Sequence, residues 1–201
     1  MKKVIKNSII MVAMCTALLS NANEGSSFIP KKDSNIAKTT LTLTDVKEGQ
    51  RLIIKDLNGF ILYKEFIKES GLYSKVFDLT DLPDGDYFFE HEKDLEIKTI
   101  PFSVKSNTVT FEKDKTITLY KPYVVLKKNT IYMNKLALND ASLDLTIHYV
   151  GYNGGKELIY SETIKNTKSI ERAYKLMKSN KGNYIVTIHS DNRTYYEYFT
   201  L

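Results

Sequence analysis

The chain has few of the residues that cross-link or interrupt a fold. Its 201 residues include one cysteine, four prolines and nine glycines, and no tryptophan. A single cysteine excludes an internal disulfide, so the folded chain has to be held by strand pairing and apolar packing. Because tryptophan is absent, aromatic surface contacts rest on the 14 tyrosines and nine phenylalanines.

Motifs that carry catalysis are also missing. The sequence contains neither a Gly-x-Ser-x-Gly nucleophile turn nor a glycine-rich phosphate loop. His91 and Glu92 begin a zinc-protease motif, but Leu95 stands at the position of its second histidine. We therefore predict a noncatalytic protein that uses no cofactor.

Positive charge is not concentrated in any dense run of lysine and arginine, which argues against nucleic acid or an anionic membrane as the partner. The formal charge is +5, and three of the positive residues, Lys2, Lys3 and Lys6, precede an apolar run at residues 9–19. That run is too short to span a bilayer, so it predicts the signal peptide of an exported protein.

Small residues at positions 20–22 place signal-peptide cleavage after Ala22, with a neighbouring bond as an alternative. A lipid anchor on Cys15 is a further alternative, although Met14 is larger than the residue that usually precedes a lipidated cysteine. Cleavage would remove the only cysteine and the three lysines, which lowers the formal charge from +5 to +2. No later apolar stretch approaches membrane-spanning length, so we expect the mature protein in the periplasm, at the cell surface or outside the cell.

The chain repeats itself at a shift of 97 positions. The identities occur without a gap and are Tyr63 with Tyr160, Glu65 with Glu162, Ile67 with Ile164, Lys68 with Lys165, Leu79 with Leu176, Gly85 with Gly182, Tyr87 with Tyr184, Asp94 with Asp191 and Phe102 with Phe199. A period of this length corresponds to one small domain, so we predict one fold carried twice, each copy with its own core.

Short alternating segments about ten residues apart predict strands. In the first copy they fall at residues 41–44, 52–54, 60–67, 75–79, 87–89 and 97–104, with turn signals such as Asn58-Gly59 between them. Residues 171–177 have some helical tendency, but they align with a predicted strand and are predicted to be one. The fold class is therefore all-β, with two tandem immunoglobulin-like antiparallel β-sandwich domains after a cleaved signal peptide.

Four segments follow from these patterns: a signal peptide at 1–22, a flexible polar leader at 23–38, a first sandwich at 39–113 and a second at 114–201. Two further strands are predicted between the copies, at 108–111 and 116–120. We expect the first of them to complete the first sandwich and the second to begin the second one.

A run in the first copy has the order aromatic, Asp-Leu, Leu-Pro, Gly, Tyr, and its residues are Phe77, Asp78, Leu79, Leu82, Pro83, Gly85 and Tyr87. The second copy retains Leu176, Gly182, Asn183 and Tyr184. This order resembles the small immunoglobulin-like β-sandwiches of exported bacterial proteins, including type IX secretion C-terminal sorting domains and related uncharacterised secreted modules. The resemblance implies an exported β-sandwich and, as one option, a role as an accessory of secretion.

One turn of the first copy is acidic and carries Asp78, Asp81, Asp84 and Asp86. Carboxylate oxygens are the ligands that Ca²⁺ prefers, so this turn is a candidate calcium site. The interpretation we favour is that these residues form a good turn and that their carboxylates are solvated.

The corresponding turn of the second copy is basic. Asp78, Asp81 and Asp84 fall on Lys175, Lys178 and Lys181. We hypothesise that these opposite charges steer contact between the two domains, or between molecules that join head to tail. The alternative is independent drift of two solvated turns.

Tyrosines are densest near residue 196. A strand there places Tyr196 and Tyr198 on one face and Tyr195, Phe199 and Leu201 on the other. If the second set faces the core, the first is an exposed aromatic pair that can stack on a sugar or a protein, or that only stiffens the sheet.

Taken together, these features predict a noncatalytic exported protein that acts through its surfaces, as an adhesion, scaffold or envelope-associated interaction module. The partner would be a protein or a glycan at the cell envelope. The main alternative is a carbohydrate-binding module that uses the exposed tyrosines, and a second alternative is the secretion accessory.

Overall fold

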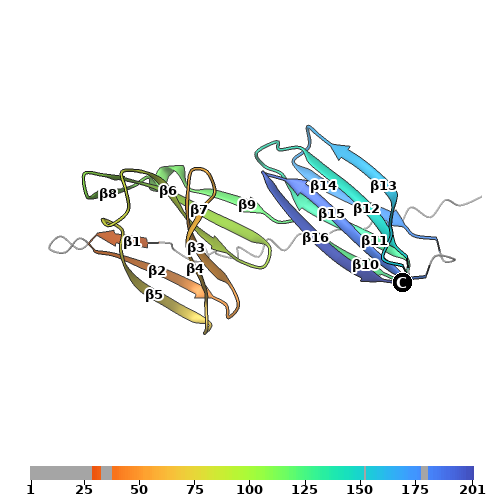
Figure 1. Ribbon diagram of the computed structural model, residues 1–201, viewed down its shortest axis with the longest axis horizontal. Coiled ribbons are helices and arrows are strands. Elements are labelled where there is room, and N and C mark those ends of the chain that lie inside the picture. Colours follow the sequence, from red (N-terminus) through yellow and green to blue (C-terminus); the bar gives the residue numbers. More distant parts are fainter. Residues whose placement is uncertain (1–28, 33–37, 152, 178–180) are drawn as a thin grey trace, which may run out of the picture.

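The computed structural model describes residues 29–32, 38–151, 153–177 and 181–201. Antiparallel strands make up almost all of this part, and they form two sandwiches that follow each other along the long axis (Figure 1). The one helical element within these ranges is the 3-10 turn η1 (Lys113–Lys115). The predicted all-β fold class is therefore confirmed, whereas the predicted signal peptide lies outside the described residues.

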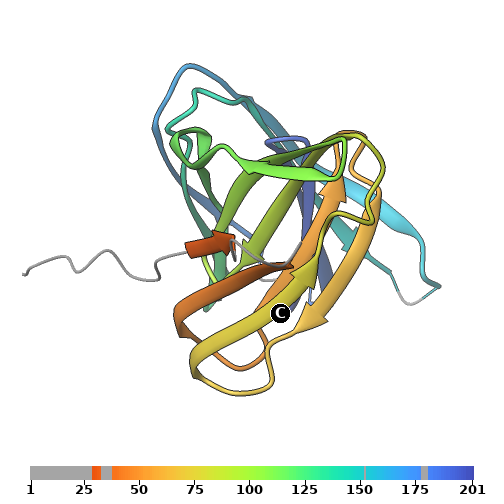
Figure 2. The ribbon, with the colours of Figure 1, turned by 90° about the vertical axis from the view of Figure 1, so that its left-hand side faces the viewer.

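A sheet of three strands packs on a larger sheet to form the first domain (Figure 2). The small sheet has the order β1-β2-β5 and the large sheet contains the order β4-β3-β6-β7. These strands are β1 (Ile29–Lys32), β2 (Lys38–Val46), β3 (Arg51–Asp56), β4 (Ile61–Phe66), β5 (Gly71–Asp78), β6 (Gly85–Glu92) and β7 (Glu96–Lys105). Strand β1 pairs with β2. These four residues of the predicted leader thus belong to the sheet rather than to a flexible segment.

The second domain repeats this strand order. Its sheets have the orders β10-β11-β14 and β13-β12-β15-β16. The strands are β10 (Tyr123–Lys127), β11 (Thr130–Leu136), β12 (Leu143–Val150), β13 (Lys156–Ile164), β14 (Ser169–Lys175), β15 (Asn183–Ser190) and β16 (Arg193–Thr200). Each strand occupies the position of its counterpart in the first domain, as the internal repeat predicts. The segment with helical tendency, residues 171–177, lies largely in β14, so the strand prediction is correct there.

Two strands of the first domain have no counterpart in the second. Both β8 (Thr108–Phe111) and β9 (Ile117–Tyr120) pair with the outer edge of β7. The prediction that residues 116–120 begin the second sandwich is therefore wrong, and the boundary between the sheets lies after Tyr120 rather than at 113/114. Local alternation predicted the strand correctly but could not identify its partner, because pairing depends on which edge is free in space.

Each domain has its own apolar core. Inward-facing residues alternate along β2, where Leu41 and Leu43 are fully buried, and the same alternation along β12 buries Leu143 and Leu145. The two buried clusters share no residue. Because burying a leucine side chain contributes about 2 kcal/mol, such alternation stabilises each sandwich without a cross-link.

The turns follow the predicted chemistry. Gly59 has a φ of +83°, and its N–H donates to Asp56 O (3.1 Å) in the turn between β3 and β4. Glycine adopts this left-handed conformation without a steric penalty, which explains the Asn-Gly pair there. In the second domain the equivalent turn is longer, and Gly151 N donates to Gly155 O (2.9 Å).

Tyr87 closes the turn between β5 and β6. Its side chain is buried at the start of β6, and its hydroxyl donates to Pro83 O (2.7 Å). This geometry is the tyrosine corner of immunoglobulin-like sandwiches. Tyr184, its counterpart in the repeat, is buried at the start of β15.

We expect Tyr87→Phe to lower the free energy of unfolding of the first domain by about 1 kcal/mol, because one hydrogen bond is lost while the ring stays packed. Chemical denaturation checks this value. Tyr196→Phe is the control, since that hydroxyl is on an exposed side chain, and an equal loss in both variants would contradict the role of the corner.

Candidate interaction surfaces

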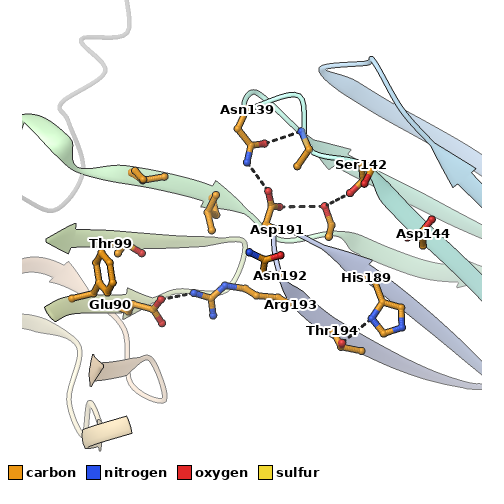
Figure 3. A pocket seen from close by; sticks show the side chains of 15 residues that line it. Glu90, Thr99, Asn139, Ser142, Asp144, His189, Asp191, Asn192, Arg193 and Thr194 are labelled. Atoms are coloured by element: carbon orange, nitrogen blue, oxygen red, sulfur yellow. Dashed lines mark hydrogen bonds and ion pairs between the residues drawn. The ribbon is translucent and has the colours of Figure 1, made fainter. Parts of the chain in front are cut away.

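A hollow of about 870 Å³ lies where the two domains meet (Figure 3). The first domain lines it with residues of β6, β7 and β9, and the second with the segment between β11 and β12 and the turn between β15 and β16. The tip of that turn, residues 191–193, therefore lies against the outer face of the first domain's large sheet.

One ion pair crosses this junction. The Arg193 guanidinium donates to the Glu90 carboxylate, and Lys55 Nζ lies 2.7 Å from the other oxygen of Glu90. The Glu90 side chain is only 7% exposed, so two cations compensate one nearly buried carboxylate. A pair of this kind fixes geometry more than it adds stability, because desolvation offsets much of the attraction.

A second ion pair holds the connecting segment. Lys135 Nζ lies 2.7 Å from Asp191 Oδ2 and also donates to Tyr120 O (2.8 Å) at the end of β9. The two side chains are 1% and 3% exposed. Burial raises the pKa of Asp191, but the bonds from Lys135 and Asn139 outweigh it and hold this pKa below its usual value. The second domain is thus tied to the last strand of the first.

A smaller hollow of about 510 Å³ lies on the same junction. Glu92 accepts from Arg51 and, at 2.9 Å, from Lys121. Burial raises the pKa of Glu92, but these two cations outweigh it and leave the pKa below its usual value. The Tyr195 hydroxyl, which also lines this hollow, is buried with no hydrogen-bond partner among the described residues.

Hydroxyl groups and one imidazole also line the large hollow. The His189 ring lies 2.8 Å from Thr194 Oγ1, and the Ser190 hydroxyl donates to Ser142 O (3.2 Å). Asp144 stands opposite His189 on β12, but its carboxylate accepts from Thr163 (2.6 Å). His189, Thr194 and Asp144 are all exposed.

The predicted tyrosine pair is exposed on the outer face of the second domain's large sheet. Tyr196 and Tyr198 are 56% and 70% exposed, while Tyr195, Phe199 and Leu201 pack against the core. The division of these residues between two faces is therefore as predicted. Strand register extends the patch, because Tyr198 stands opposite Ile185 and Ile185 stands opposite His148 on the next strand.

A carboxylate held by two tyrosines and a cation recurs in both domains. Glu65 accepts from Tyr63, from Tyr73 (3.1 Å) and from Lys75 (2.5 Å). The bonds from Lys75 and Tyr63 lower the pKa of Glu65, and burial raises that of Tyr73.

In the second domain Glu162 accepts from Arg172 (2.9 Å) and Tyr174 (2.9 Å). Burial raises the pKa of Glu162, but these partners outweigh it and lower the pKa overall. The first cluster joins β4 to β5 and the second joins β13 to β14. In each domain these strands lie where the two sheets meet at one side of the sandwich. Sequence reasoning missed them, although Tyr63 with Tyr160 and Glu65 with Glu162 are among the identities that reveal the repeat.

The acidic turn lies at the end of the first domain that faces away from the second. All four of its aspartates are exposed. Asp78 Oδ1 accepts from Thr80 N (3.2 Å) within the turn, and Asp84 Oδ1 accepts from Ser106 N (2.9 Å) in the neighbouring turn between β7 and β8, so two carboxylates have structural bonds. Within the described ranges, no group of three or more histidine, cysteine, aspartate or glutamate side chains is placed to hold a metal ion.

The basic turn lies at the opposite end of the molecule. Lys175 and Lys181 are exposed, and Lys178 lies outside the described residues. Lys181 precedes Gly182, whose N–H donates to Leu201 O (3.2 Å), which places the turn beside the end of β16. The two turns therefore do not touch within one molecule (Figure 1).

His91 and His189, which occupy similar places in the two sequences, have different environments. His91 is fully buried and one ring nitrogen lies 2.8 Å from Gln50 Oε1. Burial, the first cause, and the charge of Lys93 lower the pKa of His91 to about 4. His189 is exposed.

Comparison with known proteins yields no family model and no curated protein that matches the sequence. Distant similarity exists to solved structures with all-β domains. A biofilm-associated protein BSP domain is 12% identical over 88% of this chain and 29% of its own, with a TM-score of 0.26. The chain thus spans less than a third of that structure.

Two other solved structures are at a similar distance. The ligand-binding domain of human OSCAR is 10% identical over 82% of this chain and 89% of its own, with a TM-score of 0.24. Native alpha-2-macroglobulin from Escherichia coli is 14% identical over 89% and 72%, with a TM-score of 0.25. At these scores the similarity says nothing about function.

No helix in the described part of the chain is both long and apolar enough to cross a bilayer.

Proposed function

We propose that the protein is a noncatalytic, exported interaction module that acts as an adhesion or scaffold protein at the cell envelope. The observation that supports this most directly is the junction between the domains. The ion pairs Arg193–Glu90 and Lys135–Asp191 hold it, and exposed apolar and charged side chains are present on the outer surfaces of the sandwiches. A rod of two fixed domains presents its surfaces at constant spacing, which suits a scaffold.

The chemistry of the junction supports the noncatalytic part of this proposal. The buried ionisable groups there, Asp191, Glu92 and Glu90, are each satisfied by cations. The lowered pKa values of Glu92 and Asp191 fit a structural role, whereas a general acid or base needs a pKa near the working pH. Among the residues that the structure describes, no buried carboxylate orients the imidazole of His189, which pairs with the exposed Thr194.

Binding of the purified mature protein to isolated envelopes tests the proposal. We expect saturable binding that protease treatment of the envelopes removes if the partner is a protein and that periodate treatment removes if it is a glycan. Absence of binding, or a mature protein that fractionates with the cytoplasm, would contradict the proposal.

A second candidate function, carbohydrate binding, is favoured by the exposed tyrosine pair Tyr196 and Tyr198. Aromatic rings that stand side by side on one face of a strand can stack on the apolar faces of sugar rings. We expect Tyr196→Ala combined with Tyr198→Ala to weaken glycan binding at least tenfold, since each aromatic contact contributes about 1 kcal/mol.

Glycan-array binding and calorimetry with the array's best ligand measure this effect. Tyr123→Ala is a matched control, because Tyr123 is also about half exposed but lies on β10, in the other sheet. Glycan binding that survives the double substitution, or an array without ligands, would reject this candidate.

A further inference from the structure

The charges of this molecule are separated along its long axis. The two domains meet through the turn between β15 and β16, so each domain has one end that faces away from the other (Figure 1). In the first domain this far end holds the turns between β3 and β4, β5 and β6, and β7 and β8. In the second domain it holds the turns between β10 and β11, β12 and β13, and β14 and β15.

We define the basic pole as the lysines at the far end of the second domain. Strand register brings them together, because Thr130 stands opposite Lys175 and Val150 opposite both Lys156 and Asn183. The described members are Lys127, Lys128, Lys156, Lys175 and Lys181. All five are exposed and none forms an ion pair within the described residues. Glu157 is the one carboxylate side chain next to them in the register.

We define the acidic pole as the aspartates at the far end of the first domain. Asp56 stands opposite Tyr87 near the start of β6, so the turn after β3 lies beside the acidic turn. The members are Asp56, Asp78, Asp81, Asp84 and Asp86. Among the side chains described there, Lys38 and Lys105 partly offset them.

Each pole also exposes an apolar side chain. Phe60 is 68% exposed in the turn between β3 and β4, beside Leu57. Met177 is 73% exposed between Lys175 and Lys181. Large apolar groups ringed by charge are typical of protein contact sites, and a thioether packs well on an aromatic ring.

From this arrangement we propose that the protein associates head to tail, with the basic pole of one molecule bound to the acidic pole of a second copy. The inference deepens the proposed scaffold function and rests on it. Both halves of the contact are present on this one chain, with opposite charge and with Met177 facing Phe60 and Leu57. A polyanionic polymer would bind the lysines but would offer no apolar contact to the exposed Met177.

The geometry of such a contact is heterologous, because two different surfaces meet. Since the poles lie at opposite ends, the contact leaves both outer poles free and assembly continues into an open chain of molecules. Exposed charges separated by more than about 10 Å are screened at 0.1 M salt, so the association is salt-dependent.

Sedimentation velocity of the mature protein, from micromolar to millimolar concentration, tests the proposal. We expect a mass average that rises with concentration and a dissociation constant at least tenfold larger at 0.5 M than at 0.05 M salt. Lys175→Glu with Lys181→Glu should weaken association at least tenfold. Asp81→Lys with Asp84→Lys should do the same.

Mixing these two variants is the decisive step. In the first variant the charges of the basic pole nearly cancel and only the acidic pole is intact, and in the second variant only the basic pole is intact. Each variant alone is therefore expected to stay monomeric, while their mixture associates through the two intact poles. Lys165→Glu with Lys168→Glu is the matched control, because it changes the net charge equally at exposed lysines of the turn between β13 and β14.

Three results would overturn the proposal: a wild-type protein that stays monomeric at low salt, association that both pole variants retain, or a mixture that stays monomeric. A monomeric protein that still binds envelopes would reject head-to-tail assembly and leave the proposed interaction module standing. Binding of the monomer to vesicles of anionic lipid, lost in the lysine variant, would reassign the basic pole to a membrane surface.

Discussion

The Asp191→Asn variant is expected to lose about 3 kcal/mol of free energy of unfolding, because it leaves the Lys135 ammonium buried without its counter-charge. The Lys135 side chain is 1% exposed, so water cannot replace the lost carboxylate. Asparagine tolerates the positive φ of +54° at this position, which keeps backbone strain out of the comparison. Calorimetric unfolding of the full chain measures the loss.

The control for this prediction removes both charges. Lys135→Met combined with Asp191→Asn is expected to recover most of the lost stability, since a buried ion pair contributes little more than an apolar replacement. The double variant also loses the bond to Tyr120 O, so small-angle scattering should show a wider range of interdomain angles. Equal destabilisation of the single and double variants would show that the charge is not the cause.

The first domain is expected to lose about 3 kcal/mol of stability as the pH falls from 6.5 to 4. His91 is fully buried and its pKa is about 4, against 6.5 for an ordinary histidine. The unfolded state therefore takes up a proton in this window and the folded state does not. The stability that neutral His91 contributes is fully present above pH 6.5, decreases as the pH falls and is lost below the folded-state pKa of about 4. A difference of 2.5 pKa units corresponds to about 3 kcal/mol.

The cause of this effect is local. Burial is the largest cause of the lowered pKa of His91. The positive charges of Lys93 and Lys98 lower this pKa further, and the negative charge of Glu96 raises it. Buried carboxylates with lowered pKa values, such as Glu92 and Asp191, lose their contribution only at lower pH, below the usual range of a carboxylate. In the first domain, the interval from pH 6.5 to 5 thus isolates the contribution of His91.

The second domain supplies the control. Leu52 stands opposite His91 in β6, and Leu145 stands opposite Ile188 in β15, so Ile188 occupies the place of His91. By the same register Leu143 occupies the place of Gln50. We expect Gln50→Leu with His91→Ile to remove the pH dependence of the first domain.

Hydrogen exchange of the β6 and β15 amides reads the two domains separately in one sample. Protection in β6 is expected to fall between pH 6.5 and 5 after correction for the intrinsic exchange rate, while protection in β15 does not fall, because the raised pKa of partly buried Glu197 favours the folded second domain as the pH falls. A wild-type first domain that shows no such fall, or a double variant that keeps it, would contradict the assignment to His91.

Much of the fold was predictable because its signals are local. Alternation along residues 41–44 and the turn at Asn58-Gly59 each depend on a few neighbouring residues, and both are where the pattern predicted them. The repeat then transferred these assignments to the second copy, including the strand at Ser169–Lys175 that local propensity alone would have left ambiguous. The placement of Tyr196 and Tyr198 on one face of the strand and Tyr195 on the other follows from the two-residue alternation of side chains along a strand.

The junction was not predictable, as Asp94 and Asp191 show. The two residues are identical in the repeat and occupy the same turn. The Asp94 side chain is 67% exposed and forms a surface ion pair with Lys47, whereas that of Asp191 is buried with Lys135. Nothing in their sequence neighbourhoods separates these environments, because burial at a junction depends on which surfaces the two domains place together. The calcium site at the acidic turn, the role of Lys178 and the secretion accessory stay predictions.

By itself, the sequence determined that this protein consists of strands, that one sandwich occurs twice and which face of each strand is apolar, because these properties are set by residues within one strand or one turn. Only the tertiary structure decided that β9 completes the first sheet, that Lys135 and Asp191 are buried together and that the acidic and basic turns lie at opposite ends. Those features depend on contacts between segments far apart in the chain, and such contacts follow from how two finished domains pack rather than from any local pattern.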